Sequence, residues 1–311
     1  MQARYRTQLP QLSGDVFITD GGMETTLIFH EGIDLPLFGA FDLLKDDEGR
    51  AALRAYYASY VELARERGVG IVLDTPTWRA SRDWGAQLGY SAGELDAVNR
   101  AAVSLVGELR DAGDTIVISG CIGPRGDGYR ADDRMTAAEA EDYHAAQIAS
   151  FAATEADLVS ALTLTYVDEA VGVVRAASKA GMPAVVSFTV ETDGLLPSGM
   201  TLQEAIERVD AETESAAAYF MINCAHPTHF EHVLEDGAPW VARIGGLRAN
   251  ASVKSHAELD ESETLDEGDP VDLGRRYGAL RSRLPAASVV GGCCGTDHRH
   301  VAEICAAWIS A

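Results

Sequence analysis

The sequence predicts an α/β fold of the TIM-barrel type, a (β/α)8 barrel, and two observations lead to that prediction. Short runs rich in Val, Ile, Leu and Phe alternate with helical patterns from one end of the chain to the other. There are eight such runs, and their near-continuous apolar content is typical of parallel strands covered on both faces. The 311 residues suit one barrel, and no linker or change in composition divides them. We therefore expect a single domain over residues 1–311.

Turn-forming residues and helix start signals bound each of these runs. An open doubly wound sheet is the alternative, but no Gly-x-Gly-x-x-Gly follows the first run, and eight regular units favour closure. The predicted strands are Val16–Thr19, Gly70–Leu73, Thr115–Ser119, Asp157–Leu164, Ala184–Val190, Tyr219–Asn223, Trp240–Gly245 and Ser288–Val290.

Clear start signals mark the helices between the strands. Capping boxes of the form Ser/Thr-x-x-Glu begin at Ser91, Thr136 and Thr201. Asp269-Pro270 suits an N-cap followed by a proline in the first turn. The segment Arg50–Arg67 has the helical period in its apolar residues and is followed by a glycine that can end the helix.

Two segments lack a clear apolar face. Lys254–Asp272 is strongly acidic, and we expect a long loop there after the seventh strand. Ile122–Asp133 is rich in Gly, Asp and Arg but has no complete EF-hand pattern, so we expect a solvated loop.

The composition excludes several kinds of partner. With 25 basic and 48 acidic residues the net charge is −23, which argues against binding to nucleic acid or to an anionic membrane surface. No stretch approaches the ~20 apolar residues of a membrane span, and Met1–Gln11 lacks the apolar core of a signal peptide. We therefore expect a cytoplasmic protein whose five cysteines are thiols, with Cys121 and Cys305 as small buried side chains.

In a barrel of this type the reactive groups lie at the carboxyl ends of the strands. In this chain those ends are polar or rich in glycine, which predicts that this rim carries a site. The segments concerned are Asp20–Thr25, Asp74–Arg79, Gly120–Pro124, Glu191–Asp193, Asn223–Pro227, Arg248–Asn250 and Cys293-Cys294.

The strongest single signal is the pair Cys293-Cys294 inside the run Gly291–Gly295. Together with Cys224, the pair would form a three-thiolate site with one open coordination position, as catalytic zinc requires. Strands six and eight are separated by one strand, a gap of roughly 10 Å that two inward-leaning side chains can close on a metal. Adjacent cysteines point to opposite faces of a regular strand, so the flanking glycines are needed to bend the backbone. A substrate thiol in the open position would bind as the nucleophilic thiolate.

Two other uses of these residues remain open at this point. Cys293-Cys294 can be a redox-active vicinal pair. A metal can instead be held by His226, His229 and His232 beside Cys224, since their spacing places them on one helical face. We expect His298 and His300 to cap or solvate the start of the last helix.

These residues resemble the motifs of the homocysteine S-methyltransferase family, and the resemblance covers essentially the whole chain. The motifs are Asp-Gly-Gly-x-Glu-Thr at Asp20–Thr25, Asn223-Cys224, and Gly-Gly-Cys-Cys-Gly at Gly291–Gly295. Members of this family are zinc-dependent (β/α)8 barrels that move a methyl group onto a thiol. The resemblance implies Zn²⁺ on Cys224, Cys293 and Cys294, with Asp20 and the backbone of the two following glycines holding the amino-acid part of the thiol substrate.

Further residues take predicted roles from the same resemblance. Thr75 and Trp78 match a Thr-x-Thr-aromatic segment after the second strand, and Asn250 matches the asparagine of a Pro-Asn-Ser-Gly segment whose proline is Ala249 here. The full set that we predict to bind substrate is Asp20, Gly21, Gly22, Glu24, Thr25, Thr75, Trp78, Arg79, Glu191, Asn223 and Asn250.

The chain departs from the family pattern at two positions. Leu162 stands where the family carries a glutamate that pairs with the substrate ammonium, and Arg79 stands where Tyr or Gln is common. We expect Glu191, at the end of strand five with Asp193, to supply the missing carboxylate from the next position around the rim. Arg79 would either clamp a carboxylate of the substrate or donor, or form a surface salt bridge.

We therefore predict a zinc-dependent transfer of a methyl group from a free small-molecule donor to a thiol. S-methylmethionine and S-adenosylmethionine are the leading donors, betaine is a weaker candidate, and homocysteine giving methionine is the expected reaction. The alternatives are a different acceptor thiol, a zinc-thiolate sensing barrel without methyltransferase activity, and a redox barrel that uses Cys293-Cys294 as a dithiol. The oligomeric state is left open.

Overall fold

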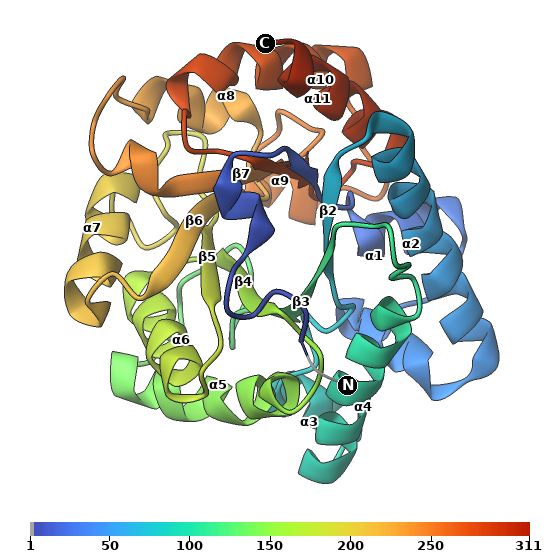
Figure 1. The fold of residues 1–311 in the computed structure, drawn as a ribbon. Helices are drawn as coiled ribbons and strands as arrows, with labels where there is room; N and C mark the ends of the chain where they lie inside the picture. Colours follow the sequence, from blue (N-terminus) through green and yellow to red (C-terminus); the bar gives the residue numbers. More distant parts are fainter. Residues whose placement is uncertain (1–2) are drawn as a thin grey trace.

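Eight parallel strands close into a barrel in the computed structural model, which describes residues 3–311 (Figure 1). The strands are hydrogen-bonded in sequence order, and β8 pairs with β1 to complete the ring. The predicted (β/α)8 fold is confirmed. The strands are β1 (Phe17–Ile18), β2 (Gly70–Asp74), β3 (Ile116–Ile122), β4 (Leu158–Leu164), β5 (Ala184–Phe188), β6 (Ala217–Asn223), β7 (Ile244–Ala249) and β8 (Val289–Gly292).

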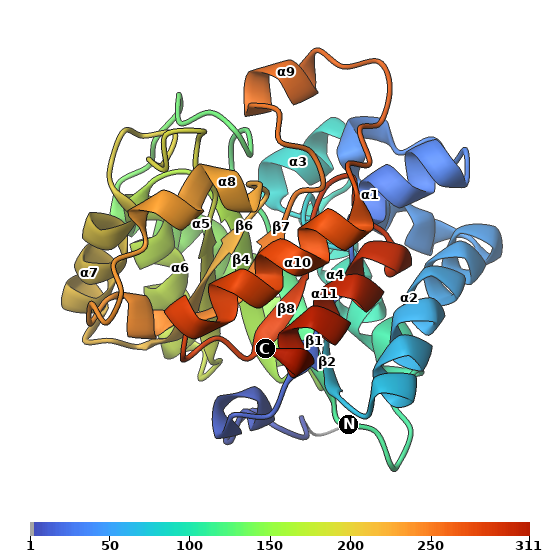
Figure 2. The same ribbon diagram turned by 90° about the horizontal axis from the view of Figure 1, so that it is seen from above.

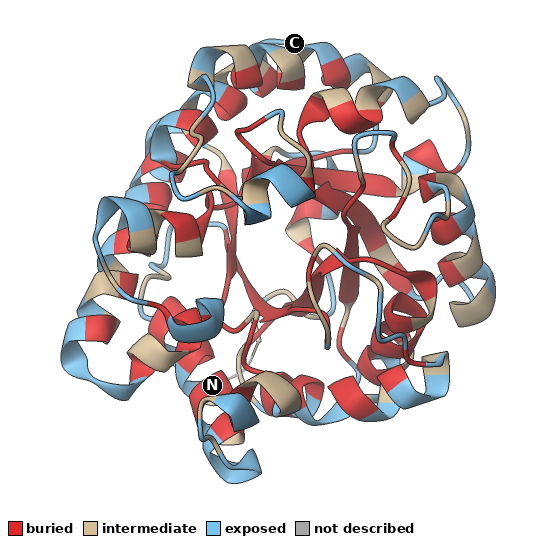
Figure 3. Cartoon of the chain, turned by 180° about the vertical axis from the view of Figure 1, so that it is seen from behind, coloured by how far each residue is buried: buried red, intermediate tan, exposed pale blue. Residues whose placement is uncertain are grey.

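Helices cover the outside of the barrel. In Figure 3 the strands are buried, whereas the outward faces of the surrounding helices are exposed. None of the helices over residues 3–311 is both long and apolar enough to cross a membrane. The α-helices are α1 (Met23–Thr25), α2 (Asp47–Arg67), α3 (Arg82–Gln87), α4 (Ala92–Gly107), α5 (Ala137–Ala152), α6 (Val167–Lys179), α7 (Leu202–Thr213), α8 (Pro227–Phe230), α9 (His256–Asp260), α10 (Pro270–Leu280) and α11 (His298–Ser310).

The predicted helix caps are confirmed, whereas α2 begins at Asp47, before the predicted Arg50. Capping boxes open α4 at Ser91, α5 at Thr136 and α7 at Thr201, and the Asp269 side chain caps α10 by accepting from two backbone N–H groups. Each box satisfies donors that the first helical turn leaves unpaired. His300 and its capping partner at the start of α11 complete a further box, as expected for the last helix.

The seventh strand is displaced from its predicted position. Instead of Trp240–Gly245 it runs over Ile244–Ala249, and Val241–Arg243 forms a 3₁₀ turn before it. The predicted range stopped at Gly245, before Leu247 and the charged Arg248. In the folded barrel this arginine is buried and its charge is paired, so the strand continues through it.

The acidic segment after β7 is not a plain loop. It contains the short helix α9, which begins with a capping box between Ser255 and Glu258 that the sequence analysis overlooked. Figure 2 shows α9 standing above the barrel on the side where β7 ends, the same side as α1 and α3. α9 therefore lies over the rim where a site is expected.

The interior of the barrel has two layers of different polarity. The lower layer is apolar and is closed from below by Leu9; its strand residues are Phe17, Val72, Val117, Leu158, Val185, Tyr219, Met221 and Val289. Two residues further along the strands, the interior positions become polar. They are Asp74, Ser119, Ser160, Ser187, Asn223 and Arg248, all buried. This alternation at period two fills the bottom of the barrel and directs chemically active groups toward its carboxyl end.

A buried carboxylate fixes the amino-terminal segment to the lower end of the barrel. Asp157 accepts hydrogen bonds from the backbone N–H groups of Arg4 at 2.8 Å, Tyr5 at 2.7 Å and Ile118 at 2.9 Å. Its charge is paired with buried Arg110. Such a fully bonded carboxylate is costly to remove because its partners lose their acceptor inside the protein.

We therefore predict that Asp157→Ala lowers the free energy of unfolding by about 3–5 kcal/mol, because it leaves the Arg110 charge buried and unpaired. Urea denaturation followed by circular dichroism measures the change. Asp15→Ala, which removes an exposed carboxylate, serves as the control and should change stability by less than about 0.5 kcal/mol. A loss below about 1 kcal/mol in Asp157→Ala would contradict this role of the carboxylate.

Candidate active site

A cavity opens at the carboxyl ends of the strands. It encloses about 950 Å³, counted to its open mouth, and its walls come from the segments that follow β1, β2, β3, β4, β6, β7 and β8. Most of the residues predicted to form a site lie on these walls. They are Asp20, Gly21, Gly22, Glu24, Thr75, Trp78, Arg79, Asn223, Cys224, Cys293 and Cys294.

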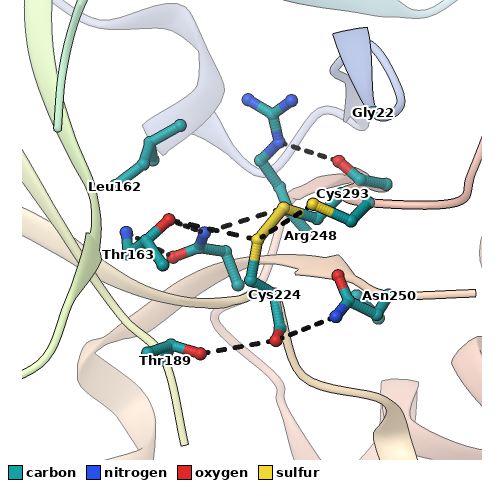
Figure 4. Close-up of a disulfide and its surroundings, with 12 residues drawn as sticks. Gly22, Leu162, Thr163, Thr189, Cys224, Arg248, Asn250 and Cys293 are labelled. Carbon is teal, nitrogen blue, oxygen red and sulfur yellow. Dashed lines mark hydrogen bonds between the residues drawn. A yellow bond between two sulfur atoms is a disulfide. The ribbon is translucent and has the colours of Figure 1, made fainter. Parts of the chain in front are cut away.

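Three cysteine sulfurs meet on one wall of this cavity. The Sγ atoms of Cys224, Cys293 and Cys294 lie within 4.8 Å of one another, although they come from the ends of two different strands. The Cα atoms of Cys224 and Cys293 are 5.4 Å apart, so the backbone segments that follow β6 and β8 approach each other closely (Figure 4). The Sγ atom of Cys294 is 4.0 Å from that of Cys224.

Cys224 and Cys293 are joined by a disulfide, which corrects the expectation of five thiols. The physical reason is the convergence itself, because two cysteines at this Cα separation are within disulfide reach. The alternative of a bonded vicinal pair is wrong for this structure, since Cys294 is free. Cys121 and Cys305 are free and buried, as predicted, although Cys121 also lines the cavity.

Glycines allow the first loop to pack directly against the cysteine turn. A Cβ atom on Gly22 would lie 2.6 Å from the carbonyl oxygen of Cys293. A Cβ atom on Gly292 would lie 1.9 Å from the Thr296 hydroxyl oxygen. Gly295 has a φ of 77°, a conformation that favours glycine and turns the chain back after the second cysteine. The sequence Gly-Gly-Cys-Cys-Gly is thus required by backbone geometry.

Polar side chains surround the three sulfurs. The Thr163 hydroxyl lies 4.0 Å from the sulfur of Cys224, and the Asn223 amide nitrogen lies 3.9 Å from that of Cys293. The Tyr129 hydroxyl donates to the sulfur of Cys294 at 3.6 Å. Donors in these positions stabilise negative charge on sulfur.

Tyr129 is a site residue that the sequence analysis missed. It belongs to the loop after β3 that was expected to be merely solvated, and its ring stacks on His256 with centroids 4.1 Å apart. His256, the first residue of α9, contacts the carbonyl oxygen of Cys224 at 2.8 Å through Nε2. Nothing in the sequence connects these segments, because they meet only after the barrel has closed.

A buried arginine bridges two acids at the floor of the cavity. Arg248 pairs with Asp20 and with Asp74, and its Nε donates to the Gly292 carbonyl oxygen at 3.1 Å. Burial raises the pKa of Asp20 to about 6, against the opposing effect of Arg248. Burial also opposes the charge on Arg248, but Asp20 and Asp74 raise its pKa overall. The three groups thus hold one another in place.

Glu24 is a partly buried carboxylate on the cavity wall. Its carboxylate accepts a hydrogen bond from its own backbone N–H. Within residues 3–311 no basic side chain forms a salt bridge with it. Burial raises the pKa of Glu24 to about 7, and nearby Asp20 adds to the shift. The side chain is therefore without a counter-charge inside the cavity.

Arg79 is held between two tryptophans. Its guanidinium carbon lies 4.0 Å from the centroid of Trp78 and 3.6 Å from that of Trp84, and Nη1 donates to the Gly126 carbonyl oxygen at 3.0 Å. It is buried, and no acid within residues 3–311 forms a salt bridge with it. The alternative of a surface salt bridge is therefore wrong. Burial lowers the pKa of Arg79 to about 10.

Three residues of the predicted substrate set lie outside the cavity lining. Glu191 contacts Nδ1 of His256 at 3.2 Å, so its carboxylate does not stand in for the missing glutamate at Leu162. Asn250 donates to the carbonyl oxygen of Cys224 at 3.1 Å (Figure 4). The Thr25 hydroxyl accepts from the Gly295 backbone N–H at 3.1 Å. These side chains brace the cysteine segments from behind.

The histidine alternative for a metal site is wrong. His226 caps α8 through its side chain, His229 contacts the Val253 carbonyl oxygen at 2.9 Å, and His232 contacts the Asp193 carbonyl oxygen at 3.2 Å. The three rings are engaged with three different backbone segments.

The donor set of the cavity fits a zinc ion. Three sulfur ligands with mutual distances below 4.8 Å can surround one ion at Zn–S ~2.3 Å and leave a fourth position open. Burial raises the pKa of the Cys294 thiol to about 11, so a nearby cation is needed to hold that sulfur as thiolate. The disulfide must be reduced before all three sulfurs can bind a metal.

Comparison with known proteins gives a consistent result. Residues 17–308 match the family model described as homocysteine S-methyltransferase. An S-methylmethionine–homocysteine S-methyltransferase (BHMT2) from Rattus norvegicus is 23% identical, over 94% of this chain and 78% of the relative. The oxidised form of the homocysteine methyltransferase MmuM from Escherichia coli superimposes with a TM-score of 0.74 at 19% identity, covering 95% of this chain and 99% of that one. Its metallated form gives 0.72 at 19% identity, covering 94% and 96%.

We predict that Arg248→Met lowers the free energy of unfolding by about 3–5 kcal/mol, because Asp20 and Asp74 would remain buried together without a counter-charge. Denaturant titration at pH 8 measures the loss. Because Arg248 lowers the pKa of Asp20, its removal raises that pKa further above the wild-type value of about 6, so the loss should shrink as the pH falls from 8 toward 6 and the carboxylate becomes protonated in the variant. The control Arg65→Met, which removes an exposed ion pair, should cost less than about 1 kcal/mol. Equal losses in both variants would contradict the bridging role of Arg248.

Proposed function

This chain belongs to the homocysteine S-methyltransferase family and is an S-methyltransferase, and we propose that it transfers a methyl group from a small-molecule donor to a thiol at a zinc centre. One observation carries the proposal. The sulfurs of Cys224, Cys293 and Cys294 lie within 4.8 Å of one another on the wall of the barrel cavity. A methyl donor and an acceptor thiol can meet in this cavity next to the sulfurs.

Cys224, Cys293 and Cys294 would hold the ion. When bound, Zn²⁺ would lower the pKa of an acceptor thiol at its open position, so that the thiol is present as the nucleophilic thiolate near neutral pH. Thr163, Asn223 and Tyr129 hydrogen-bond to the ligand sulfurs and fix their orientation.

The remaining cavity residues position the reactants. Trp78 and Leu162 give the cavity an apolar wall, and the indole N–H of Trp78 donates to the Leu162 carbonyl oxygen at 3.2 Å, which fixes the ring. Methyl transfer needs the thiolate sulfur in line with the methyl carbon and the leaving sulfur, and holding the reactants in this geometry accounts for much of the expected rate enhancement.

The expected reaction is the methylation of homocysteine to methionine. S-methylmethionine is the first donor to test, because it appears in the name of the curated relative, and S-adenosylmethionine is the second. The acidic groups on and around the cavity wall, Glu24, Asp127 and Asp260, favour a cationic sulfonium over a neutral donor. A reducing compartment such as the cytoplasm, which we propose as the location, would keep the three thiols available.

One observation favours a second candidate, a redox protein. The disulfide between Cys224 and Cys293 is the oxidised form of such a centre. A redox protein would act without metal and would lose activity on alkylation of its thiols. A zinc-thiolate sensor without catalysis is the third candidate, and it would bind zinc but transfer no methyl group.

We predict that the reduced protein binds one Zn²⁺ per chain and that Cys294→Ala reduces both zinc content and methyl transfer at least about a hundredfold, because two thiolates cannot retain the ion. Zinc is measured by mass spectrometry after dialysis, and transfer by label from methyl-labelled S-methylmethionine to homocysteine. Cys305→Ala, far from the cavity, is the control and should retain both. Full zinc binding without transfer from any sulfonium donor would favour the sensor, and metal-independent activity would favour the redox protein.

A further inference from the structure

The cavity is lined by a cationic side chain, Arg79, and by a partly buried carboxylate, Glu24, and neither forms a salt bridge within residues 3–311. We propose that Glu24 and Arg79 bind the ammonium and the carboxylate of an α-amino acid substrate, and so provide the recognition that the carboxylates at the cavity floor cannot. This assignment rests on the proposed methyl transfer, since it concerns the substrates of the same cavity.

The two carboxylates at the floor share one counter-charge. Asp20 accepts from Arg248 on one oxygen and from the Tyr56 hydroxyl at 3.1 Å on the other. Asp74 is paired with the same arginine through Oδ2, and its Oδ1 is buried without a hydrogen-bond partner among residues 3–311. An incoming ammonium could bind either acid only by displacing Arg248, which would leave a buried guanidinium without its counter-charge. The floor therefore does not offer an ammonium site.

The part of the wall formed by Leu162 and Thr163 offers no anion either. Leu162 is apolar, and Thr163 is hydrogen-bonded to Asn223, whose amide nitrogen donates to the threonine hydroxyl at 2.8 Å. Glu191, the acid that the sequence predicts to replace the missing glutamate, contacts His256 outside the cavity. An ammonium near the sulfurs must find its partner elsewhere.

Glu24 is the carboxylate that remains. It lies on the cavity wall, and over the described part of the chain no side chain donates to it or pairs with its charge. It lines the same cavity as the sulfur-bearing residues Cys293 and Cys294. A partly buried carboxylate without a counter-ion is destabilising in the empty cavity, and a substrate cation would relieve that cost.

Arg79 is the matching cation. Trp78 and Trp84 cover both faces of its guanidinium, so only the edge remains for hydrogen bonding. Nη1 donates to the Gly126 carbonyl oxygen, whereas the buried Nε has no acceptor among residues 3–311. The guanidinium edge with its parallel N–H groups suits a carboxylate, which would bind in a bidentate manner.

The other acids at the cavity are placed differently. Asp127 raises the pKa of Arg79 from beyond ion-pair distance, and one of its oxygens accepts from the Tyr129 backbone N–H at 2.7 Å. Asp260, on α9, is exposed. Glu24 and Arg79 also act on each other's charge without forming a salt bridge. Since both side chains line the same cavity, one small zwitterion can contact both.

An α-amino acid group is present both in a thiol acceptor such as homocysteine and in a donor such as S-methylmethionine. Analogues that lack one charge distinguish the two sources. For the acceptor, 4-mercaptobutanoate lacks the ammonium and 3-aminopropanethiol lacks the carboxylate. For the donor, 4-(dimethylsulfonio)butanoate lacks the ammonium.

The test uses the reduced full-length protein loaded with Co²⁺, whose visible spectrum reports thiol binding without turnover. We expect the wild type to bind homocysteine at least about tenfold more tightly than 4-mercaptobutanoate, because a charge-assisted ion pair contributes that much. Glu24→Gln should abolish this preference and change the affinity for 4-mercaptobutanoate less than about twofold. Arg79→Gln should abolish the preference for homocysteine over 3-aminopropanethiol.

Discrimination between donors is measured in the same variants by competition calorimetry. If Glu24→Gln removes the preference among donors instead, the amino acid group belongs to the donor. Glu24→Asp keeps the charge and should retain part of the preference, and Glu31→Gln, an exposed acid of the same segment, should retain all of it. Unchanged preferences for both substrates in a folded Glu24→Gln protein would overturn the assignment. A cobalt spectrum that no thiol alters would overturn the proposed function itself.

Discussion

The site depends on one geometric constraint: side chains along β6 and β8 point alternately into and out of the barrel. This matters at the level where the barrel interior changes from apolar to polar. Below this level the interior is filled by Val, Leu, Phe and Tyr side chains. At the upper level the same inward direction carries Asn223 and Arg248, and the turn after β8 brings both tandem cysteines toward Cys224. The turn is possible because glycine has no side chain. A Cβ atom at Gly22 would lie too close to the Cys293 backbone, and one at Gly292 would lie too close to the Thr296 hydroxyl.

Charge within the cavity is arranged in two classes. Arg248 forms salt bridges with both acids at the floor, Asp20 and Asp74, so these carboxylates are engaged with the protein itself. Glu24 and Arg79, higher on the wall, have no such counter-charges within residues 3–311. A protein keeps unpaired charges in a concave, partly buried place at a cost in stability, and such places are where ligand recognition is expected. We therefore expect the departures from the family pattern to affect which substrate binds more than whether a metal can bind.

Much of this was accessible from the sequence, and the limits have physical reasons. The barrel, the helix caps and the cysteine-bearing rim follow from local patterns of apolar residues, capping boxes and glycines, all of which are encoded in short segments. The position of β7 was misjudged because the acids that pair with buried Arg248 are distant in sequence. Asp20 is 228 residues away from it and Asp74 is 174 residues away. Tyr129 and His256 were missed for the same reason, since their stacking brings together two loops that no local signal connects.

The predicted role of Glu191 illustrates the difference between a rim position and a cavity position. Its place after β5 is the one expected, yet its side chain turns toward α9 and contacts His256. The helix that attracts it was itself overlooked in the acidic segment after β7. Sequence position therefore located the correct rim, but only the packing of the loops decided which acid faces the cavity.

The most direct test of the account is X-ray absorption at the zinc K-edge of the reduced protein. We expect a shell of three sulfur atoms at about 2.3 Å in the resting protein, with a fourth sulfur added when an acceptor thiol binds. A first shell made mainly of nitrogen or oxygen atoms, or a sulfur count that does not change with thiol, would contradict a three-cysteine centre with an open position for substrate.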